Sequence, residues 1–397
     1  MTPVLVLGGG LTVLGVIRTL GRAGIPTYVL TDQDDFVRHS RWFRAAPGSR
    51  GGKWGDHGLA PFLDASPIEA AVLMPCSDVW AMRVARLEPR LTARFVSSQA
   101  PAAALETLLD KGRFAGALRE AAVPHPRTEV LAGPADLDAV PDDAFAGAFL
   151  KPRDSQRFFQ RFGVKAFRVA GRADAGERLR AIGAAGFSVV FQEYIPGPAT
   201  NHYFVDGFVD RTGHLGAVFA RRRLRMYPRD FGNSTYMVSV APDRLADAIG
   251  AVRRLLEQLR YRGIFSAEFK YDEREHLFKI LEVNARPWWY VEFAARCGVD
   301  VCVMAYRDAL GLPVEPAASY CAGRALVYPY YDFGACRELR RGGELSLWEW
   351  ARSWLTAERP VFRWNDPLPA AIETAEGVGR RLRKAAWHAV GGATDGR

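Results

Sequence analysis

The sequence lacks any apolar run of the roughly 20 residues that a membrane-spanning helix requires. Its first residues, MTPVLVLGGG, contain no basic segment and no small-residue cleavage site, so we expect a first β-strand here and not a signal peptide. We find no internal repeat and no low-complexity segment. With 49% hydrophobic and 24% charged residues, the composition is that of a soluble globular protein.

Cysteine is scarce, and its spacing excludes two kinds of site. None of the five cysteines forms a CxxC pair, which argues against a zinc site and against a disulfide framework. We therefore expect reduced thiols and a cytoplasmic location. The five are Cys76, Cys297, Cys302, Cys321 and Cys336.

The net charge of +9 raises the question of nucleic-acid binding. Most basic residues are dispersed, and only two clusters stand out: ARRRLRMYPRDFG at 220–232 and GRRLRKAAWHAV at 379–390. Neither matches a nucleic-acid-binding motif. We expect no nucleic-acid partner, a phosphate-bearing small molecule at the first cluster, and a solvated helix face at the second.

The first hundred residues have the pattern of a small parallel α/β domain. Val4–Leu7 is a short apolar run before three glycines, a helical pattern follows, and 28–31 and 70–75 are further strand candidates. At 397 residues the chain is long enough for two or three domains.

The glycines Gly8–Gly10 could open a dinucleotide-binding fingerprint, GxGxxG. The third glycine position is occupied by Val13, although Asp32 follows at about the expected distance. We favour a tight turn between strand and helix, and keep a dinucleotide-dependent oxidoreductase as an alternative.

The region from residue 109 onward alternates helices with strands of a different kind. A segment at 153–164, rich in arginine and phenylalanine, looks like a mobile flap; its Phe158, Phe159 and Phe162 fit either a sealing role or ordinary packing. We expect helices at 112–123 and 243–260, and strands at 145–151, 189–194, 201–208, 215–220, 264–271 and 277–284.

The last two strands predict a hairpin with acidic residues on one face. If the turn is centred on residue 274 or 275, then Glu268 and Glu282 lie opposite or diagonal, and Lys270 and Asn284 share their face. Like charges facing each other destabilise a sheet. The repulsion between the two carboxylates could be compensated by Mg²⁺. This ion binds a few protein oxygens, here the two carboxylates and the Asn284 amide oxygen, together with substrate phosphates. Lys270 could neutralise the acids instead.

A metal–phosphate site also requires cations and a slot for a base. Lys111 and Lys151 lie at helix and strand ends from which they could reach phosphates. The segment VVFQEYIPG places Glu193 and Ile195 at a strand end, where backbone groups could pair with a purine edge. Arg286 follows the acidic strand directly, and Arg222 and Arg225 belong to the first basic cluster.

The order of these motifs resembles the ATP-grasp superfamily, especially its carboxylate–amine ligase branch, which includes the D-aspartate ligases. The resemblance runs from the first strand to about residue 310. It is carried by GGGLTVLGVIRTLGRAGIP, MPCSD, DKGRF, VPHPRT, FLKP with GVKAF, FQEYIPG, RRLRMYPRDFG, and AEFKYD with LEVNARPWW.

The resemblance implies an α/β fold in which two α+β subdomains sandwich ATP after an N-terminal parallel α/β domain. It places that first domain at 1–108, the ATP-grasp domain at 109–312 with its flap at 153–164, and a C-terminal helical extension at 313–397.

The resemblance also implies the roles of individual residues. The cofactors are ATP and Mg²⁺, with Mn²⁺ as an alternative ion. Three residues would bind the metal: Glu268, Glu282 and Asn284. Six would contact ATP: Lys111, Lys151, Lys165, Gln192, Glu193 and Ile195. Three arginines would steady the transferred phosphoryl group: Arg286, Arg222 and Arg225. Many relatives have an acidic residue after Pro-Gly to hold the ribose, but this chain continues Pro198-Ala-Thr-Asn201, which leaves ribose contact by Asn201 or His202 unassigned.

The activity implied is ATP-dependent amide formation through an acyl phosphate, with small-molecule carboxylate and amine substrates whose identity the sequence leaves open. An ATP-binding regulatory module without turnover is the other alternative. The oligomeric state is also open.

The C-terminal segment SLWEWARSWL predicts an amphipathic helix with Leu347, Trp350 and Trp354 on one face, and Trp348 and Arg352 on others. A further helix, GVGRRLRKAAWHAV, carries a basic face and Trp387. Tryptophan beside arginine suits weak peripheral contact with a membrane. We favour the alternative that these helices cover the ligase core.

Overall fold

The computed structural model describes residues 1–33, 35–49, 58–153, 155–164, 166–229, 232–317 and 319–389. The chain divides into two compact units. The first contains Met1–Ser97, Arg223–Ser239 and Pro287–Arg397, and the second contains Ser98–Arg222 and Val240–Arg286. Residues 313–397 thus group with the N-terminal residues. The boundaries at 108 and 312 stay predictions.

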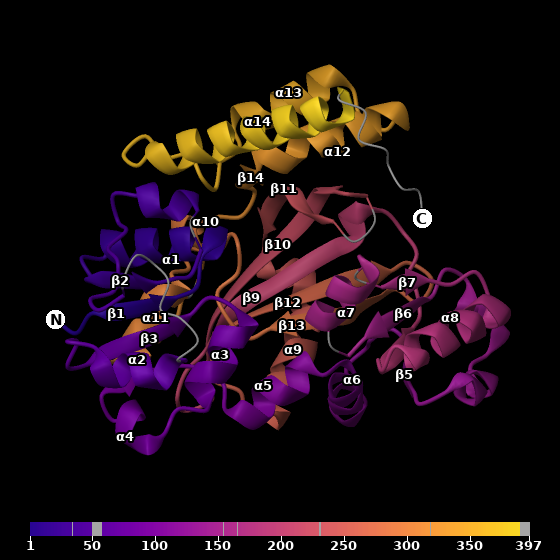
Figure 1. The fold of residues 1–397 in the computed structure, drawn as a ribbon, viewed down its shortest axis with the longest axis horizontal. Helices are drawn as coiled ribbons and strands as arrows, with labels where there is room; N and C mark the ends of the chain where they lie inside the picture. Colours follow the sequence, from indigo (N-terminus) through magenta and orange to yellow (C-terminus); the bar gives the residue numbers. More distant parts are fainter. Residues whose placement is uncertain are drawn as a thin grey trace. The chain divides into compact units, whose positions relative to one another are not determined.

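A four-stranded parallel sheet forms the core of the first unit, as the sequence predicts. Its strand order is β2 (Thr27–Leu30), β1 (Val4–Leu7), β3 (Ala71–Pro75) and β4 (Phe95–Val96). β1 and β3 are buried along their whole length, which explains their unbroken apolar runs. Helix α1 (Gly10–Arg22) follows β1 and packs on α10 (Val291–Cys297) and α11 (Val301–Ala309) (Figure 1).

The glycine loop before α1 makes a tight turn. Gly8 and Gly10 have φ angles of 128° and 69°, in the region that other residues rarely adopt. The backbone N–H of Gly10 donates to Oδ2 of Asp35 at 2.7 Å. A phosphate at this helix N-terminus would meet that carboxylate, which argues against the dinucleotide alternative.

The smaller sheet of the second unit has the order β5 (Thr128–Leu131), β8 (Val189–Gln192), β6 (Phe149–Pro152) and β7 (Phe167–Arg168). The strand expected at 145–151 begins later, because Asp142–Phe145 form a 3₁₀ turn.

The segment expected to be a flap contains α7 (Ser155–Phe162). Phe158 is buried in one core with Phe191, and Phe162 packs against that core. α8 (Arg172–Ala184) supplies Leu179 and Ile182 to the same core. These contacts favour the packing interpretation for Phe158 and Phe162.

The larger set of strands in the second unit is antiparallel, in the order β13 (Leu277–Asn284), β12 (Gly263–Asp272), β9 (His202–Val209) and β10 (Leu215–Tyr227). Helix α9 (Ala246–Gln258) packs against β9 and β13. The arginine cluster belongs to β10, which is longer than the predicted strand and continues into the first unit.

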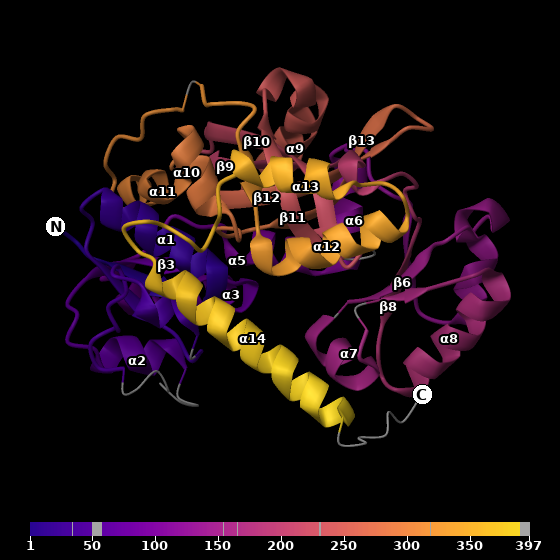
Figure 2. The ribbon, with the colours of Figure 1, turned by 90° about the horizontal axis from the view of Figure 1, so that it is seen from above.

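The C-terminal part of the first unit is mainly helical. β11 (Asn233–Val240) pairs with β14 (Ala325–Val327), and three helices follow: α12 (Pro329–Arg341), α13 (Leu347–Leu355) and α14 (Leu368–Ala389). α12 and α13 lie side by side in both ribbon views, whereas α14 is a long helix that contacts Phe36–His39 (Figure 2).

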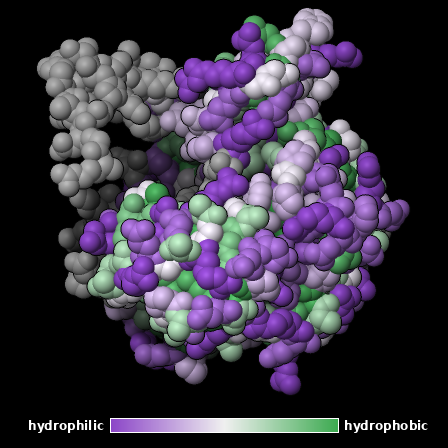
Figure 3. Space-filling model, turned by 90° about the vertical axis from the view of Figure 1, so that its right-hand side faces the viewer, coloured by the Kyte–Doolittle hydropathy of each residue, from purple (hydrophilic) through white to green (hydrophobic). Residues whose placement is uncertain are grey.

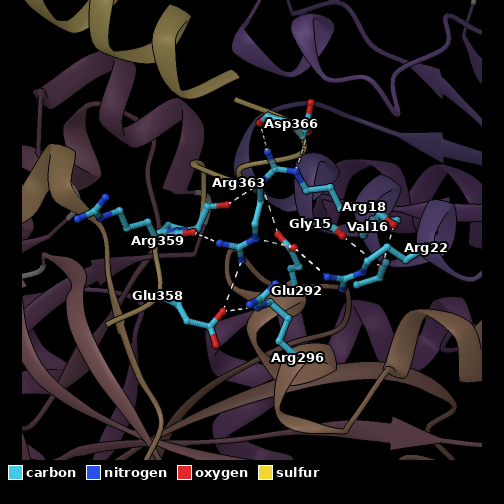
Figure 4. Close-up of polar contacts among 12 residues, drawn as sticks. Gly15, Val16, Arg18, Arg22, Glu292, Arg296, Glu358, Arg359, Arg363 and Asp366 are labelled. Atoms are coloured by element: carbon cyan, nitrogen blue, oxygen red, sulfur yellow. Dashed lines mark hydrogen bonds and ion pairs between the residues drawn. The ribbon is translucent and has the colours of Figure 1, made fainter. Parts of the chain in front are cut away.

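A buried ion-pair network fastens the segment after α13 to the helices of the first unit (Figure 4). Arg18, which is 2% exposed, donates from Nε to Asp366 Oδ2 at 2.9 Å. Its Nη1 atom lies 3.5 Å from Glu292 Oε2, and Arg363 Nε lies 3.0 Å from Glu292 Oε1. Since buried charges are stable only when paired, residues 360–366 are an integral part of this unit.

On the face shown in Figure 3, hydrophilic residues predominate and hydrophobic ones form small separate groups. Throughout the described ranges, no helix is both long enough and apolar enough to cross a membrane.

Candidate active site

The hairpin of β12 and β13 places the two predicted metal-binding acids directly opposite each other. Glu268 pairs in register with Glu282, and Ser266 pairs with Asn284. A bulge then shifts the register, so that Phe269 pairs with Ile280 and Lys270 with Lys279. The predicted register is confirmed for Glu268 and Glu282.

Hydrogen bonds orient these side chains. Nδ1 of His202, on the neighbouring strand β9, lies 2.7 Å from Oε1 of Glu268. Asn284 donates from Nδ2 to Glu282 Oε1 at 3.1 Å, and Arg286 donates from Nη2 to Asn284 Oδ1 at 3.0 Å. The result is a row of polar groups along one face of the hairpin, with the predicted Arg286 at its end.

Lys151 lies close enough to this face to interact electrostatically with it, and Lys111 lies close enough to interact with Lys151. The pKa of Lys151 is lowered to about 8: burial is the largest cause and the nearby Lys111 adds to it, while Glu282 and Glu268 act in the opposite direction. Lys151 comes from β6 and Lys111 from the first turn of α6 (Lys111–Glu120). The structure thus brings together two lysines and two carboxylates that are far apart in sequence.

The segment expected to contact the base joins β8 to the larger sheet. Lys151 Nζ donates to the side-chain oxygen of Gln192, whose amide donates to Thr128 Oγ1 at 3.1 Å. Glu193 donates its backbone N–H to Arg127 O at 2.9 Å. Ile195 is buried.

Two features of this segment were not predicted. The Glu193 carboxylate is held by Arg274, whose Nη2 lies 2.6 Å from Oε1. The ring of Tyr194 lies under Lys270, with Nζ 4.8 Å from the ring centroid. Tyr194 and Lys270 therefore connect the smaller sheet to the strand that carries Glu268.

The predicted Arg222 of strand β10 does not share the face that carries Glu268 and Glu282. Arg221, and not Arg222, shares a face with Glu268, because both pair in register with Phe204 of β9. Arg222 pairs with Tyr203 on the opposite face and donates from Nε to Thr200 O at 2.7 Å. The structure therefore does not bring Arg222 to the acidic face.

Arg225 lies in the first unit and has other partners. Its Nε and Nη2 atoms donate to the two oxygens of Asp332 at 2.9 and 2.8 Å, and its guanidinium lies 4.1 Å from the centroid of the Tyr236 ring. Both side chains of the ion pair are buried. A buried bidentate pair of this kind is typical of a structural role, and the catalytic role of Arg225 stays a prediction.

The structure also reveals groups that sequence reasoning missed. Asp206 is fully buried and accepts from Arg221 Nε at 2.6 Å and from Ser266 Oγ at 2.6 Å. Burial raises the pKa of Asp206, and Glu268 lies close enough to raise it further. Alternation in HYFVDG could have indicated Asp206, since it lies four residues from His202, which contacts Glu268 on the acidic face.

The donor set suits a hard cation. Among the described residues, no three His, Cys, Asp or Glu side chains form a metal-binding group. The candidate ligands are two carboxylates and one amide oxygen, and opposed carboxylates repel each other until a cation neutralises them. Such oxygen ligands fit Mg²⁺, which completes its coordination with water and phosphate. Lys165 lies outside the described residues, as does Asp154 in the expected flap.

The chain resembles known proteins in sequence and in fold. No family model matches the sequence. Over 223 residues the chain is 23% identical to D-aspartate ligase of Enterococcus faecium (strain Aus0004), a match covering 54% of this chain and 53% of the relative. The chain therefore spans about half the length of the curated relative that it matches.

Solved structures cover more of the molecule. N5-carboxyaminoimidazole synthetase from Staphylococcus aureus superposes with a TM-score of 0.65 at 14% identity, over 86% of each chain. L-amino acid ligase from Bacillus licheniformis superposes with a TM-score of 0.60 at 14% identity, over 82% of this chain and 78% of the other. The chain therefore has the ATP-grasp fold, as its motifs predict.

Proposed function

We propose that this protein is an ATP-dependent carboxylate–amine ligase. The observation that carries the proposal is the opposition of Glu268 and Glu282, with Asn284 on the same strand and Lys151 nearby. Carboxylate, amide and ammonium groups in this arrangement suit a nucleoside triphosphate with its divalent ion. The similarity to D-aspartate ligase and L-amino acid ligase supports the same reaction class.

The site residues have distinct tasks in this proposal. Glu268, Glu282 and Asn284 would hold Mg²⁺, or Mn²⁺ in its place, which supplies positive charge to the phosphates when bound. Lys111 and Lys151 bind phosphate oxygens, and Arg286 and Arg221 stabilise charge on the transferred phosphoryl group. The backbone around Glu193 and Ile195 contacts the adenine.

The proposed reaction has two steps. An oxygen of the substrate carboxylate attacks the γ-phosphorus of ATP, and the bond from that phosphorus to the ADP oxygen breaks. The nitrogen of the amine then attacks the acyl carbon, phosphate leaves with the C–O bonding electrons, and the nitrogen loses a proton to give the amide. Water would hydrolyse the acyl phosphate, so we assign the segment 153–164 to covering it.

The substrates that we propose are small and resemble amino acids. Two relatives carry amino-acid substrates in their names, one a D-amino acid and the other L-amino acids. Each substrate must supply one carboxylate or one amine. We place the reaction in the cytoplasm, where ATP and reduced thiols are both available.

A substrate screen tests this function. The purified chain is incubated with ATP, Mg²⁺ and pairs drawn from D- and L-amino acids and small carboxylates, and phosphate and ADP release are measured with mass detection of the amide. A ligase releases one ADP per amide only when both substrates are present. ADP release that needs neither substrate would contradict the proposal. ATP binding without ADP release under every pair would also contradict it and would favour the regulatory module.

A further inference from the structure

Exposed apolar side chains are concentrated in one part of the first unit. Large hydrophobic residues with exposed side chains cluster between residues 333 and 368, and the extremes are Trp348, Leu355 and Trp364, which are 72%, 81% and 90% exposed. The others are Phe333, Leu347 and Leu368. Single exposed apolar residues are ordinary, but six within 36 residues of sequence call for an explanation.

Helix α13 turns one aromatic face inward and another outward. Trp350 and Trp354 donate from Nε1 to Asp332 Oδ2, each at 2.8 Å. These two tryptophans therefore pack within the first unit, and the covering of the ligase core stays a prediction. The outward face carries Trp348, Arg352 and Leu355, at positions i, i+4 and i+7, and α13 contains no buried residue.

Around this face, several arginine side chains lack partners within the ranges that the structure describes, whereas the acidic side chains have them. Within the described part of the chain, five exposed arginines have no hydrogen-bond or ion-pair partner for their side chains: Arg337, Arg340, Arg341, Arg352 and Arg359.

The acidic residues of the same segment are engaged. Asp332 pairs with Arg225, Glu344 with Arg229, and Glu358 with Arg296 and Arg324. Glu338 accepts from the backbone N–H of Arg229, and Glu349 caps α13 at Ser346. Glu338 and Glu349 keep their negative charge in these hydrogen bonds, and the five arginines exceed them by three. The surface of α12 and α13 therefore presents an excess of positive charge together with exposed tryptophan and leucine.

We propose that the outer face of α13, with the arginines of α12 and α13, binds the surface of an anionic lipid membrane. Tryptophan and leucine would enter the boundary between head groups and acyl chains, while the arginine head groups contact lipid phosphates. The excess of positive charge favours this partner over a second copy of the chain, because two such faces would repel each other. Binding is peripheral and depends on both apolar contact and charge.

Vesicle cosedimentation of the full chain tests the proposal. Vesicles of phosphatidylcholine with about a third phosphatidylglycerol are compared with pure phosphatidylcholine vesicles, at low and high salt. We expect binding to the anionic vesicles alone, weakened at least ten-fold by raising the salt from 0.05 to about 0.5 M, since the Debye length shortens severalfold.

Two variants separate the apolar contribution to vesicle binding from the contribution of charge. Trp348→Ser with Leu355→Ser, and Arg337→Gln with Arg341→Gln and Arg352→Gln, should each weaken vesicle binding at least ten-fold. Arg253→Gln with Arg260→Gln and Arg262→Gln is the matched control. It removes the same charge from three exposed arginines of the second unit that also lack side-chain partners among the described residues, and it should leave binding unchanged. Circular dichroism and thermal unfolding establish that each variant is folded.

Three results would overturn the inference. One is absence of binding to anionic vesicles at low salt. The second is equal loss of binding in the control, which would mean that only net charge matters. The third is a concentration-dependent dimer that the Trp348→Ser, Leu355→Ser variant abolishes, because the face would then be an interface between copies. Ligase activity is not needed for any of these measurements.

Discussion

Glu268 and Glu282 face each other across two hydrogen-bonded antiparallel strands. Opposed carboxylates cost stability unless a cation lies between or beside them. His202 and Asn284 orient the pair through hydrogen bonds of 2.7 and 3.1 Å, and Lys151 contributes positive charge. We interpret this arrangement as a binding site kept at some cost in stability.

Replacing one of the opposed acids tests the metal assignment. Glu282→Gln conserves volume at an exposed position and removes the repulsion, so the thermal midpoint without Mg²⁺ should stay the same or rise. Turnover at saturating Mg²⁺ should fall below about a tenth of the parent rate, a loss of more than ~1.4 kcal/mol in transition-state stabilisation.

The matched control is Glu129→Gln, which changes an exposed acid of β5 in the same unit and should leave the rate unchanged. If Glu282→Gln retains more than a tenth of the rate, Glu282 is not a metal ligand.

The lowered pKa of Lys151 predicts that ATP binding depends on pH. Burial lowers its pKa from 10.5 to about 8, so between these values the unfolded chain holds a proton that the folded chain lacks. The contribution of this group to the free energy of unfolding therefore rises with pH across that window, and it is most unfavourable below pH 8.

Phosphate favours the charged ammonium, so ATP binding should draw a proton onto Lys151 above pH 8. We expect ATP affinity to fall by up to about ten-fold per pH unit there, with proton uptake approaching one per ATP. Calorimetry in two buffers of different ionisation enthalpy measures that uptake. Lys151→Arg should abolish it, since an arginine stays charged throughout, whereas Lys151→Ala should weaken ATP binding at every pH. Equal ATP binding by Lys151→Ala would remove this lysine from the site.

Local sequence pattern predicted much of the fold and part of the site. The period of two in FSAEFKYD and LFKILEVN, with a short turn between them, was enough to set Glu268 opposite Glu282. The bulge after Glu268 was not predictable from that alternation, because it depends on how the two strands twist in the complete sheet.

The arginine assignments show where local pattern was insufficient. Three consecutive arginines leave their facing undetermined until the strand and its partners are known, and pairing with β9 selects Arg221. For Arg225 the deciding partner, Asp332, lies 107 residues further along the chain. The resemblance to the ATP-grasp superfamily identified the arginine-rich motif. Pairing with the neighbouring strands determined which of its arginines faces Glu268 and Glu282.

The two neighbouring arginines of β10 form a natural matched pair. Arg221→Gln should lower turnover at least ten-fold, because Arg221 shares the face of Glu268 and pairs with Asp206. Arg222→Gln should change turnover less than three-fold, since its side chain lies on the other face. Steady-state kinetics and unfolding curves for both variants separate catalysis from folding. The reverse order of effects would restore Arg222 as the phosphoryl-contacting residue.

Asp332 is the acceptor on which the core beneath α12 and α13 depends. Its buried carboxylate accepts from Arg225 at 2.9 and 2.8 Å, from Thr235 Oγ1 at 2.6 Å, and from the indoles of Trp350 and Trp354. Asp332→Leu leaves the buried Arg225 charge unpaired and should destabilise the first unit by about 3–5 kcal/mol. Adding Arg225→Met should recover part of that loss, because two apolar groups can replace a buried ion pair. The recovery is partial because Thr235, Trp350 and Trp354 still lack their acceptor. Urea unfolding followed by tryptophan fluorescence measures both effects. The double variant also decides the role of Arg225: turnover close to the parent value assigns it to stability alone, whereas a folded double variant without turnover would return Arg225 to the catalytic set.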